Sequence, residues 1–359
     1  GKMEVYAAAG ETISAGRAVT IGLQDTSKTV AFPIQYADPE FGQSISLGAA
    51  VGSQSHSIWC TAQEKYIIAY INDTTGDGEF RVGELDDQGI EITLDPTIHY
   101  FGENIGGEFS VSYDIATTRT VFAWRDSITN IGYARVITLA GFSVTMSEFP
   151  IDFSLSSPIG THSVSCDTAS GNVVFHYADQ ESLGTGVGRL AELDGLDLLF
   201  QPPIPFTTKE VYQIHTVYNS IGNRHVSVFI DELGTGWSFV TIVSSLFLTF
   251  RTPRGIWDNM TTPFVTLMKG GSECWVAYRR TNTVPAQGWV TRFTNSNNGT
   301  TNTNYTGAQY THYPFENGQD SVETPYKMSN VDPAIIGSQD TRGATIVWGR
   351  EDQLGNVSL

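Results

Sequence analysis

The sequence predicts an all-β protein, a six-bladed β-propeller, because a unit of about 50 residues recurs along the chain. Each unit holds runs rich in Val, Ile, Phe, Tyr, Trp and Thr, the residue types that strands favour, and turn residues separate the runs. In the clearest copy the runs are Phe109–Tyr113, Thr120–Trp124, Tyr133–Leu139 and Phe142–Phe153. Four strands at this period are typical of a propeller blade.

An aromatic residue followed by polar or charged residues ends the second run of every copy. Successive markers lie 54, 53, 52, 49 and 70 residues apart. The near-constant spacing indicates six copies, with an insertion before the last. The marker residues are Tyr70, Trp124, Tyr177, Phe229, Tyr278 and Trp348.

A Pro–x–aromatic signature marks the fourth run of a copy. It reads PTIHY at Pro96–Tyr100, FPIDF at Phe149–Phe153 and PPIPF at Pro202–Phe206. Proline suits an outer strand because one side of that strand need not donate hydrogen bonds. The signature therefore predicts that the fourth run forms the outer edge of each blade.

The sixth copy ends without a fourth run, but the N-terminal region contains a near match, FPIQY at Phe32–Tyr36. We expect a strand at about 30–36 to complete the last blade, because closing the ring removes unpaired strand edges. The sequence thus predicts an N-terminal β-arm over residues 1–29 and a propeller over residues 30–359.

The arm carries the pattern A-x-G-E-T-I-S-A-G-x-A-V-x-I from Ala8 to Ile21. This pattern resembles a short β-module near the start of tail, fibre or head-decoration proteins in tailed-phage virions. The resemblance covers about Tyr6 to Ile34, and a plain β-arm packed on the ring is the other interpretation. It implies a virion anchor formed by Glu11, Thr12, Ile13, Ala15 and Gly16.

Composition limits the partners. The formal net charge is −18 and only 16% of residues are charged, while 40% are hydrophobic. Such a chain can build a core and repels nucleic acid, so no nucleic-acid partner is expected. No apolar run is long enough to cross a bilayer, and the first residues do not form a signal peptide. Three cysteines cannot form a disulfide framework.

Two insertions account for the long spacing before the last copy, and insertions on one rim often carry binding function. The insertions and the residues between them contain Tyr305, Tyr310, Tyr313 and Tyr326, and the preceding run contains Trp289. Amphipathic aromatic side chains suit contact with a glycan or a protein. These five residues are the predicted rim site, although a solvated loop would have the same composition.

Acidic residues past the second run suggest a weaker cation site. Asp73 and Asp77 flank glycine as in a miniature calcium loop, so Ca²⁺ is the one cofactor considered; otherwise no cofactor is expected. Asp126, Asp179 and Asp231 follow the second run of later copies, where a ring of carboxylates could form. The favoured interpretation is that each Asp begins a turn by bonding its own backbone.

Motifs for catalysis are missing from the sequence. The seven histidines show no zinc-binding spacing, and no nucleophile elbow, P-loop or dinucleotide fingerprint occurs. Asp114 and Asp167 could supply paired carboxylates for glycoside hydrolysis only if the fold brought them together. We therefore expect a protein that is not an enzyme.

These observations predict a structural or adhesion protein on the surface of a tailed-phage virion, outside the cell. Its arm would bind other virion proteins, its loops a host-surface glycan or protein, and it would be oligomeric in the particle. A carbohydrate-active enzyme, such as a glycoside hydrolase or lyase, or a secreted lectin on the same scaffold are the alternatives, because propellers host all of these functions.

Overall fold

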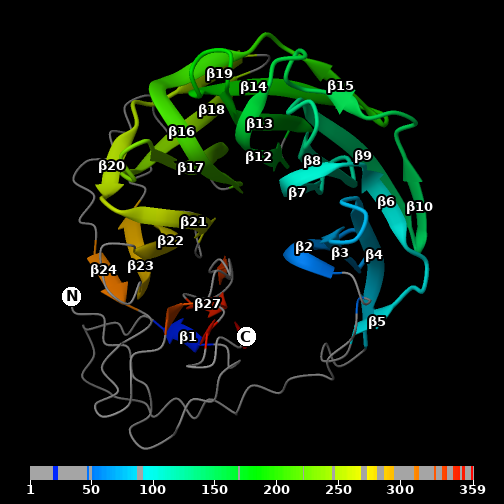
Figure 1. Cartoon of the computed structure of the whole chain (residues 1–359). Helices are drawn as coiled ribbons and strands as arrows, with labels where there is room; N and C mark the ends of the chain where they lie inside the picture. Colours follow the sequence, from blue (N-terminus) through cyan, green and yellow to red (C-terminus); the bar gives the residue numbers. More distant parts are fainter. Residues whose placement is uncertain are drawn as a thin grey trace, which may run out of the picture. The chain divides into compact units, whose positions relative to one another are not determined.

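Every regular element in the described part of this computed structural model is a β-strand, so the all-β prediction is confirmed (Figure 1). The chain divides into a larger compact unit, Phe41–Leu233 with Trp237–Gly255, and a smaller one that holds the remaining residues. The residues described are 19–22, 47, 51–86, 92–168, 170–220, 222–244, 247–267, 273–280, 287–294, 311–314, 327–328, 334–337, 343–347, 350–351 and 357–358.

Antiparallel sheets follow one another along the larger unit: copies one and two each form a five-stranded sheet, and copies three and four together form a nine-stranded sheet. Copy one contains β2 (Val51–Cys60), β3 (Lys65–Asn72), β4 (Gly78–Leu85), β5 (Ile92–Leu94) and β6 (His99–Gly102). Copy two contains β7 (Ile105–Asp114), β8 (Arg119–Asp126), β9 (Gly132–Ala140), β10 (Ser143–Met146) and β11 (Ile151–Asp152).

Copies three and four share one long strand, β16 (Ile204–Asn219), which pairs first with β14 and then with β17. Copy three also has β12 (Ile159–Asp167), β13 (Asn172–Asp179), β14 (Thr185–Asp194) and β15 (Asp197–Phe200). Copy four adds β17 (Arg224–Asp231), β18 (Gly236–Ser244), β19 (Phe247–Phe250) and β20 (Arg254–Trp257). Figure 1 shows β2, β7 and β12 on the inner side of this row and β5, β10 and β15 on its outer side.

The fourth strand is split in two in each of these copies. In copy two, β10 and β11 both pair with β9, and Ser147 between them donates its N–H to the Val136 carbonyl at 2.9 Å. The prolines of the predicted signature lie at this break, as an outer edge allows. A broken edge offers little template for pairing with another chain.

Glycine lets the aromatic residue of that signature pack against the backbone of the third strand. A Cβ on Gly132 would lie 2.5 Å from the Phe153 ring, and a Cβ on Gly186 would overlap Phe206. In copy one the ring over Gly78 is Phe101, which is fully buried, whereas Tyr100 is exposed. The predicted signature Pro96–Tyr100 therefore stops one residue short of the buried aromatic.

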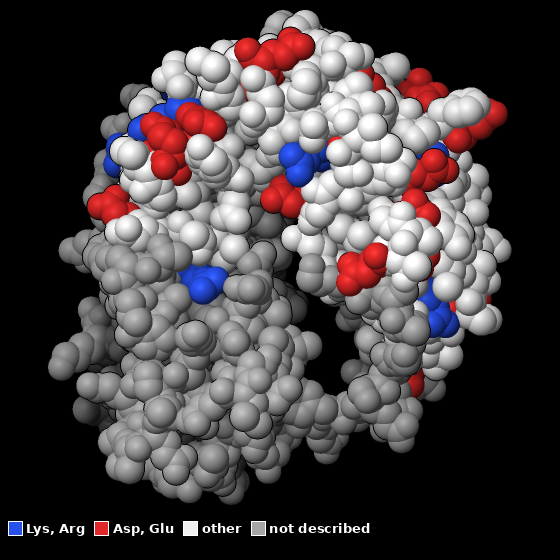
Figure 2. All heavy atoms as spheres, viewed as in Figure 1, with Lys and Arg blue, Asp and Glu red and all other residues white. Residues whose placement is uncertain are grey.

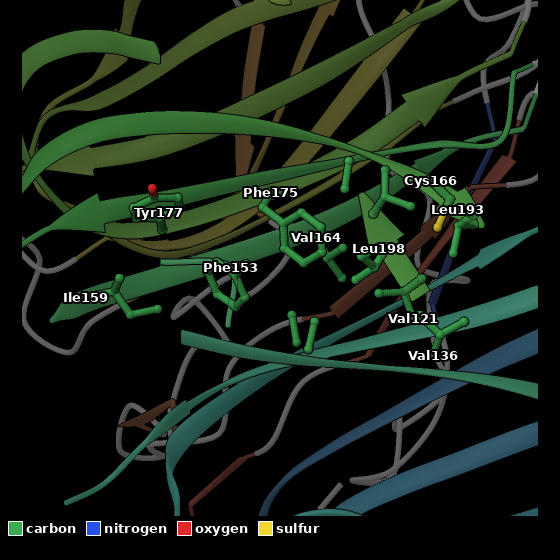
Figure 3. Close-up of a cluster of buried hydrophobic side chains, with 14 of the residues drawn as sticks. Val121, Val136, Phe153, Ile159, Val164, Cys166, Phe175, Tyr177, Leu193 and Leu198 are labelled. Carbon is green, nitrogen blue, oxygen red and sulfur yellow. The ribbon is translucent and has the colours of Figure 1, made fainter. Parts of the chain in front are cut away.

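Neighbouring sheets pack through apolar clusters. Val121, Val136 and Phe153 of copy two meet Val164 and Phe175 of copy three in one continuous core (Figure 3). Burial of apolar surface at about 25 cal/mol per Å² makes such contacts the main force holding sheets together. The predicted second-run aromatics contribute, since Tyr70, Trp124 and Tyr177 are nearly fully buried.

Serine side chains join the first strands of neighbouring copies. The Ser110 Oγ accepts from the Val164 N–H at 3.1 Å, and the Ser112 Oγ accepts from the Cys166 N–H at 2.9 Å. One repeat later the Ser163 Oγ accepts from the Thr216 N–H at 3.0 Å. Because a strand beside another sheet's edge has backbone N–H groups to satisfy, these serines fix the distance between copies.

The smaller unit contains β21 (Met260–Leu267), β22 (Glu273–Arg280), β23 (Gln287–Thr294) and β24 (Thr311–Pro314) in one four-stranded sheet. A second sheet has the order β1 (Val19–Gly22), β27 (Gly343–Val347) and β26 (Ala334–Gly337). A third contains β25 (Lys327–Met328), β28 (Arg350–Glu351) and β29 (Val357–Ser358).

An N-terminal strand therefore joins the last repeat, with Val19 opposite Ile346 and Gly22 opposite Gly343. This strand lies within the segment assigned to the arm. The expected closing strand at 30–36 lies outside the described residues.

Candidate functional site

Aspartates end the second strands and cap the turns that follow. The Asp126 Oδ1 accepts from the N–H groups of Ile128 and Thr129 at 2.9 and 2.7 Å, and from the Thr129 hydroxyl at 2.8 Å. The Asp231 Oδ1 accepts from the Leu233 N–H at 3.0 Å. These bonds support the turn interpretation. Burial raises the pKa of Asp126, but the hydrogen bonds outweigh it and lower the pKa overall.

Copy one departs from the predicted row of acids. Its turn is capped by Asn72, whose Oδ1 accepts from the Thr74 and Thr75 N–H groups at 2.9 and 3.3 Å. Asp73 is the next residue and is exposed, so it is not equivalent to Asp126. Asp77 donates its N–H to the Thr75 hydroxyl at 3.2 Å. Within the described ranges no three His, Cys, Asp or Glu side chains gather as metal ligands.

Asp114 and Asp167 also cap turns, those between first and second strands. Asp114 is fully buried and accepts from the N–H groups of Ala116 and Thr117 at 3.0 and 3.2 Å. Asp167 is nearly fully buried and accepts from the Ser170 hydroxyl. Carboxylates in these turns have no open face toward a substrate, so they do not form the paired acids of a glycosidase.

A tyrosine–glutamate pair joins the second and third strands of copy one, with Tyr70 on β3 opposite Glu79 on β4. Burial, followed by the hydrogen bond to Glu79, raises the pKa of Tyr70 to about 12. Both residues are buried, and the Asn72 amide donates to the Glu79 carboxylate at 2.7 Å. A buried phenol with a raised pKa keeps its proton at neutral pH and can donate it in a hydrogen bond to the Glu79 carboxylate.

The histidines of the inner strands are held neutral by burial. Burial lowers the pKa of His162 to about 4, although its Nε2 lies 3.0 Å from the Ala123 carbonyl. The fully buried His176 lies between two hydroxyls, Thr216 at 3.1 Å and Thr241 at 3.0 Å, and burial lowers its pKa well below 6.5. These rings bind the sheets together through hydrogen bonds.

The predicted rim site falls mostly outside the described part of the chain. Tyr305, Tyr310 and Tyr326 lie outside the described residues, as do the predicted anchor residues Glu11, Thr12, Ile13, Ala15 and Gly16. Tyr313 lies on β24, opposite Val290 of β23. Trp289 lies on β23, opposite Pro314 and Tyr278. The structure therefore leaves this site as a prediction.

Aliphatic side chains at exposed turn tips are a further feature of the structure that the sequence did not predict. Ile128, Leu183 and Leu233 lie in the turns that follow second strands, and Leu155 lies in the connection from copy two to copy three; we call these four the tip residues. Their exposed fractions are 74%, 87%, 77% and 59% in that order. These residues come from separate turns and lie at the same end of the larger unit only because the strands are aligned. The spacing of hydrophobic residues in the sequence therefore did not predict the group.

Known proteins supply a fold comparison. No protein-family model and no curated protein matches this sequence. Three solved structures share a TM-score of 0.52 with this chain. A protein from Lactobacillus plantarum is 11% identical, with 82% of this chain and 81% of that chain covered. AofleA from Arthrobotrys oligospora is 9% identical, with coverage of 86% and 82%. Kuenenia stuttgartiensis hydrazine synthase is 7% identical, with coverage of 87% and 80%.

The structural neighbours of this all-β chain are of β-propeller type. At such low identity the likeness concerns the fold alone, and propellers carry unrelated functions. The described part of the chain contains no helix of the length and hydropathy that would span a membrane.

Proposed function

We propose that this chain is a non-catalytic binding protein of a tailed-phage virion, built on a six-bladed propeller. One observation carries the proposal: in the described part of the chain, buried or half-buried acids and imidazoles that could have served chemistry form hydrogen bonds within the fold itself. Asp114 and Asp126 cap turns, and His162 and His176 join neighbouring copies of the repeat. A body of this kind presents surfaces for contact, and its function would lie in what those surfaces bind.

The pairing of β1 with β27 supports closure of the last blade by the N-terminal region. Closure by an N-terminal strand would leave the residues before β1 available as an anchor to other virion proteins. Host-surface recognition by the loops, including Tyr305 and Tyr310, remains part of the proposal.

Labelling of phage particles tests the virion role. An antibody against the chain should label intact particles of the phage that encodes it, in electron micrographs of purified virions. The proposal fails if the chain is found only in the unassembled fraction of the lysate.

The anchor can be tested with a shortened chain that lacks residues 1–16, which spares β1 at Val19–Gly22. The shortened chain should keep its thermal midpoint but should not be incorporated into particles. A glycan array with a turnover assay covers the other possibility: hydrolysis of a bound glycan would replace the proposal with a carbohydrate-active enzyme.

A further inference from the structure

The tip residues lie at one end of the larger unit, because hydrogen bonds link the turns that carry them. Ile131 forms a bridge with Pro158, which places the turn of Ile128 beside the connection that contains Leu155. The Gln180 N–H donates to the Pro158 carbonyl at 2.9 Å and brings in the turn of Leu183. The Val211 N–H donates to the Gly184 carbonyl at 2.9 Å, at the start of the copy that carries Leu233.

The turn fold does not require these aliphatic residues. Ile128 and Leu233 occupy the position two residues after the capping Asp, where each donates its N–H to that Asp. In copy one the same position is held by Thr74, which donates in the same way to Asn72. A polar residue thus satisfies the turn, and it would also leave less apolar surface in water.

Leu183 is an extra residue as well as an exposed one. The turn of copy two closes with the Asn130 N–H on the Asp126 carbonyl, four residues apart, whereas copy three closes with Gly184 on Asp179, five apart. The inserted Leu183 has a φ of 58°, and Leu155 has a φ of 59°. Bulky side chains adopt this left-handed conformation at a cost that Asn or Gly avoids. In the isolated chain, Leu183 is therefore unfavourable for both its backbone and its solvation.

The charges at this end narrow the class of partner. Glu181 and Glu232 are exposed in the turns of Leu183 and Leu233. Glu103 is exposed in the connection from copy one to copy two, which the hydrogen bond from the Ser127 N–H to the Asn104 carbonyl, at 2.7 Å, joins to the turn of Ile128. The basic residues described beside these turns are Lys209 on β16, whose Nζ lies 3.2 Å from Asp231, and Arg125 on β8, which donates to the Gly106 carbonyl at 2.9 Å. The whole chain carries a net charge of −18, and among the described residues in view in Figure 2 the acidic patches are more extensive than the basic ones. An anionic membrane, a nucleic acid or a second copy of this chain would be repelled.

The aliphatic chemistry of the tip residues favours a protein partner over a glycan. Glycans stack on aromatic faces and hydrogen-bond to polar groups, whereas the four tip residues are Ile and Leu. Exposed aliphatic groups with acidic side chains in neighbouring turns complement a surface that carries apolar side chains and basic side chains together.

We propose that the tip residues form a docking surface for a protein partner that presents apolar side chains flanked by Lys or Arg. This inference rests on the proposed binding function and names one of its surfaces, separate from the N-terminal anchor.

Two labelled peptides of equal length provide the probe, both amphipathic with the same leucines, one with Lys and one with Glu at the polar positions. Binding to the full-length chain is measured by fluorescence anisotropy at about 0.15 M salt, where weak surface attraction is screened beyond roughly 8 Å. The tip variant carries Ile128→Thr, Leu183→Asn and Leu233→Thr. Thr74 holds the position of Ile128 and Leu233 in copy one, and Asn130 of copy two adopts the same positive φ as Leu183, so the tip variant should fold.

The control variant carries Phe149→Ser and Phe247→Ser, which remove exposed apolar side chains away from the tips, before and at the outer strands. The lysine peptide should bind the unaltered chain and the control variant equally, and at least tenfold more weakly to the tip variant. The glutamate peptide should not bind. Circular dichroism melts verify that both variants are folded.

No loss in the tip variant would show attraction to the net charge or binding to another surface, and equal loss in both variants would show attraction to exposed apolar side chains in general. Either result would overturn the docking surface. Failure of the lysine peptide to bind the unaltered chain would overturn it too. Neither result touches the particle-labelling test, so the docking surface and the virion role can fail independently.

Discussion

The two ends of the repeated hairpins are built with the same turn chemistry but meet different surroundings. Asp114, in the turn between the first and second strands, accepts from two N–H groups and the Thr117 hydroxyl. Asp126, in the turn between the second and third strands, accepts from two N–H groups and the Thr129 hydroxyl. Asp114 is fully buried, whereas Asp126 is half-buried and its turn carries the exposed Ile128.

This difference teaches that the turn and its tip are determined separately. The capping residue in the second turn is Asn72, Asp126, Asp179 or Asp231, always a short side chain with an accepting oxygen. The residue two positions later varies from Thr74 and Ile128 to Glu181 and Leu233. Since the backbone bonds remain the same, the tip is free to serve a surface role.

Acid should have the largest effect and should destabilise both ends of the hairpins together. It protonates buried histidines in the interior to which both ends are attached. Burial lowers the pKa of both His162 and His225 from 6.5 to about 4. Between these values the unfolded chain binds more protons than the folded chain, so stability present above pH 6.5 is lost as the pH falls toward 4. Each histidine accounts for about 3 kcal/mol across that interval, by the conversion of roughly 1.36 kcal/mol per pKa unit.

Urea denaturation at several pH values between 7.5 and 4.5 measures this loss. The substitution His162→Gln should lower stability at pH 7.5 and flatten the decline below pH 6.5. A free energy of unfolding that stays constant from pH 7.5 to 5 would contradict the burial of neutral histidines.

Substituting the two equivalent aspartates sharpens the comparison directly. Asp114→Ala should lower the free energy of unfolding by about 3 kcal/mol, because buried N–H groups lose a charged acceptor without access to water. Asp126→Ala should cost about 1 kcal/mol, since water can replace part of what is lost. Urea denaturation at pH 7 compares the two variants, and equal losses would mean that burial does not separate the two ends.

The smallest effect concerns the backbone at the tips. Leu183→Asn should raise the free energy of unfolding by about 1 kcal/mol, because Asn adopts a positive φ more readily than Leu. Leu233→Asn is the matched control: it changes an equally exposed leucine for which no positive φ is found, and it should leave stability unchanged. A thermal midpoint that falls in the Leu183 variant would show that the side chain has a structural role.

The repeat was predictable because strand periodicity and turn residues are local. The buried aromatics Trp124 and Tyr177 and the Pro–x–aromatic signature mark real strands. Local patterns gave the wrong residue where the outcome depends on the register of the strands, which sets the side chain that caps a turn or is buried. Asp73 looked equivalent to Asp126, yet Asn72 holds that place, and Tyr100 looked equivalent to Phe153, yet Phe101 is the buried ring. A shift of one residue in register moves a side chain to the other face of the sheet, and the neighbouring residues in the sequence do not reveal such a shift.

By itself, the sequence determined the strand-rich repeat, its period and its turn-capping acids, because each depends on residues close together in the chain. Only the tertiary structure decided which groups are buried and which gather at one end. Ser110 meets Val164 in the next sheet, and Ile128, Leu155 and Leu183 share one end, through hydrogen bonds between distant residues. Contacts of this range are set by how sheets pack, and packing depends on every side chain at the interface at once.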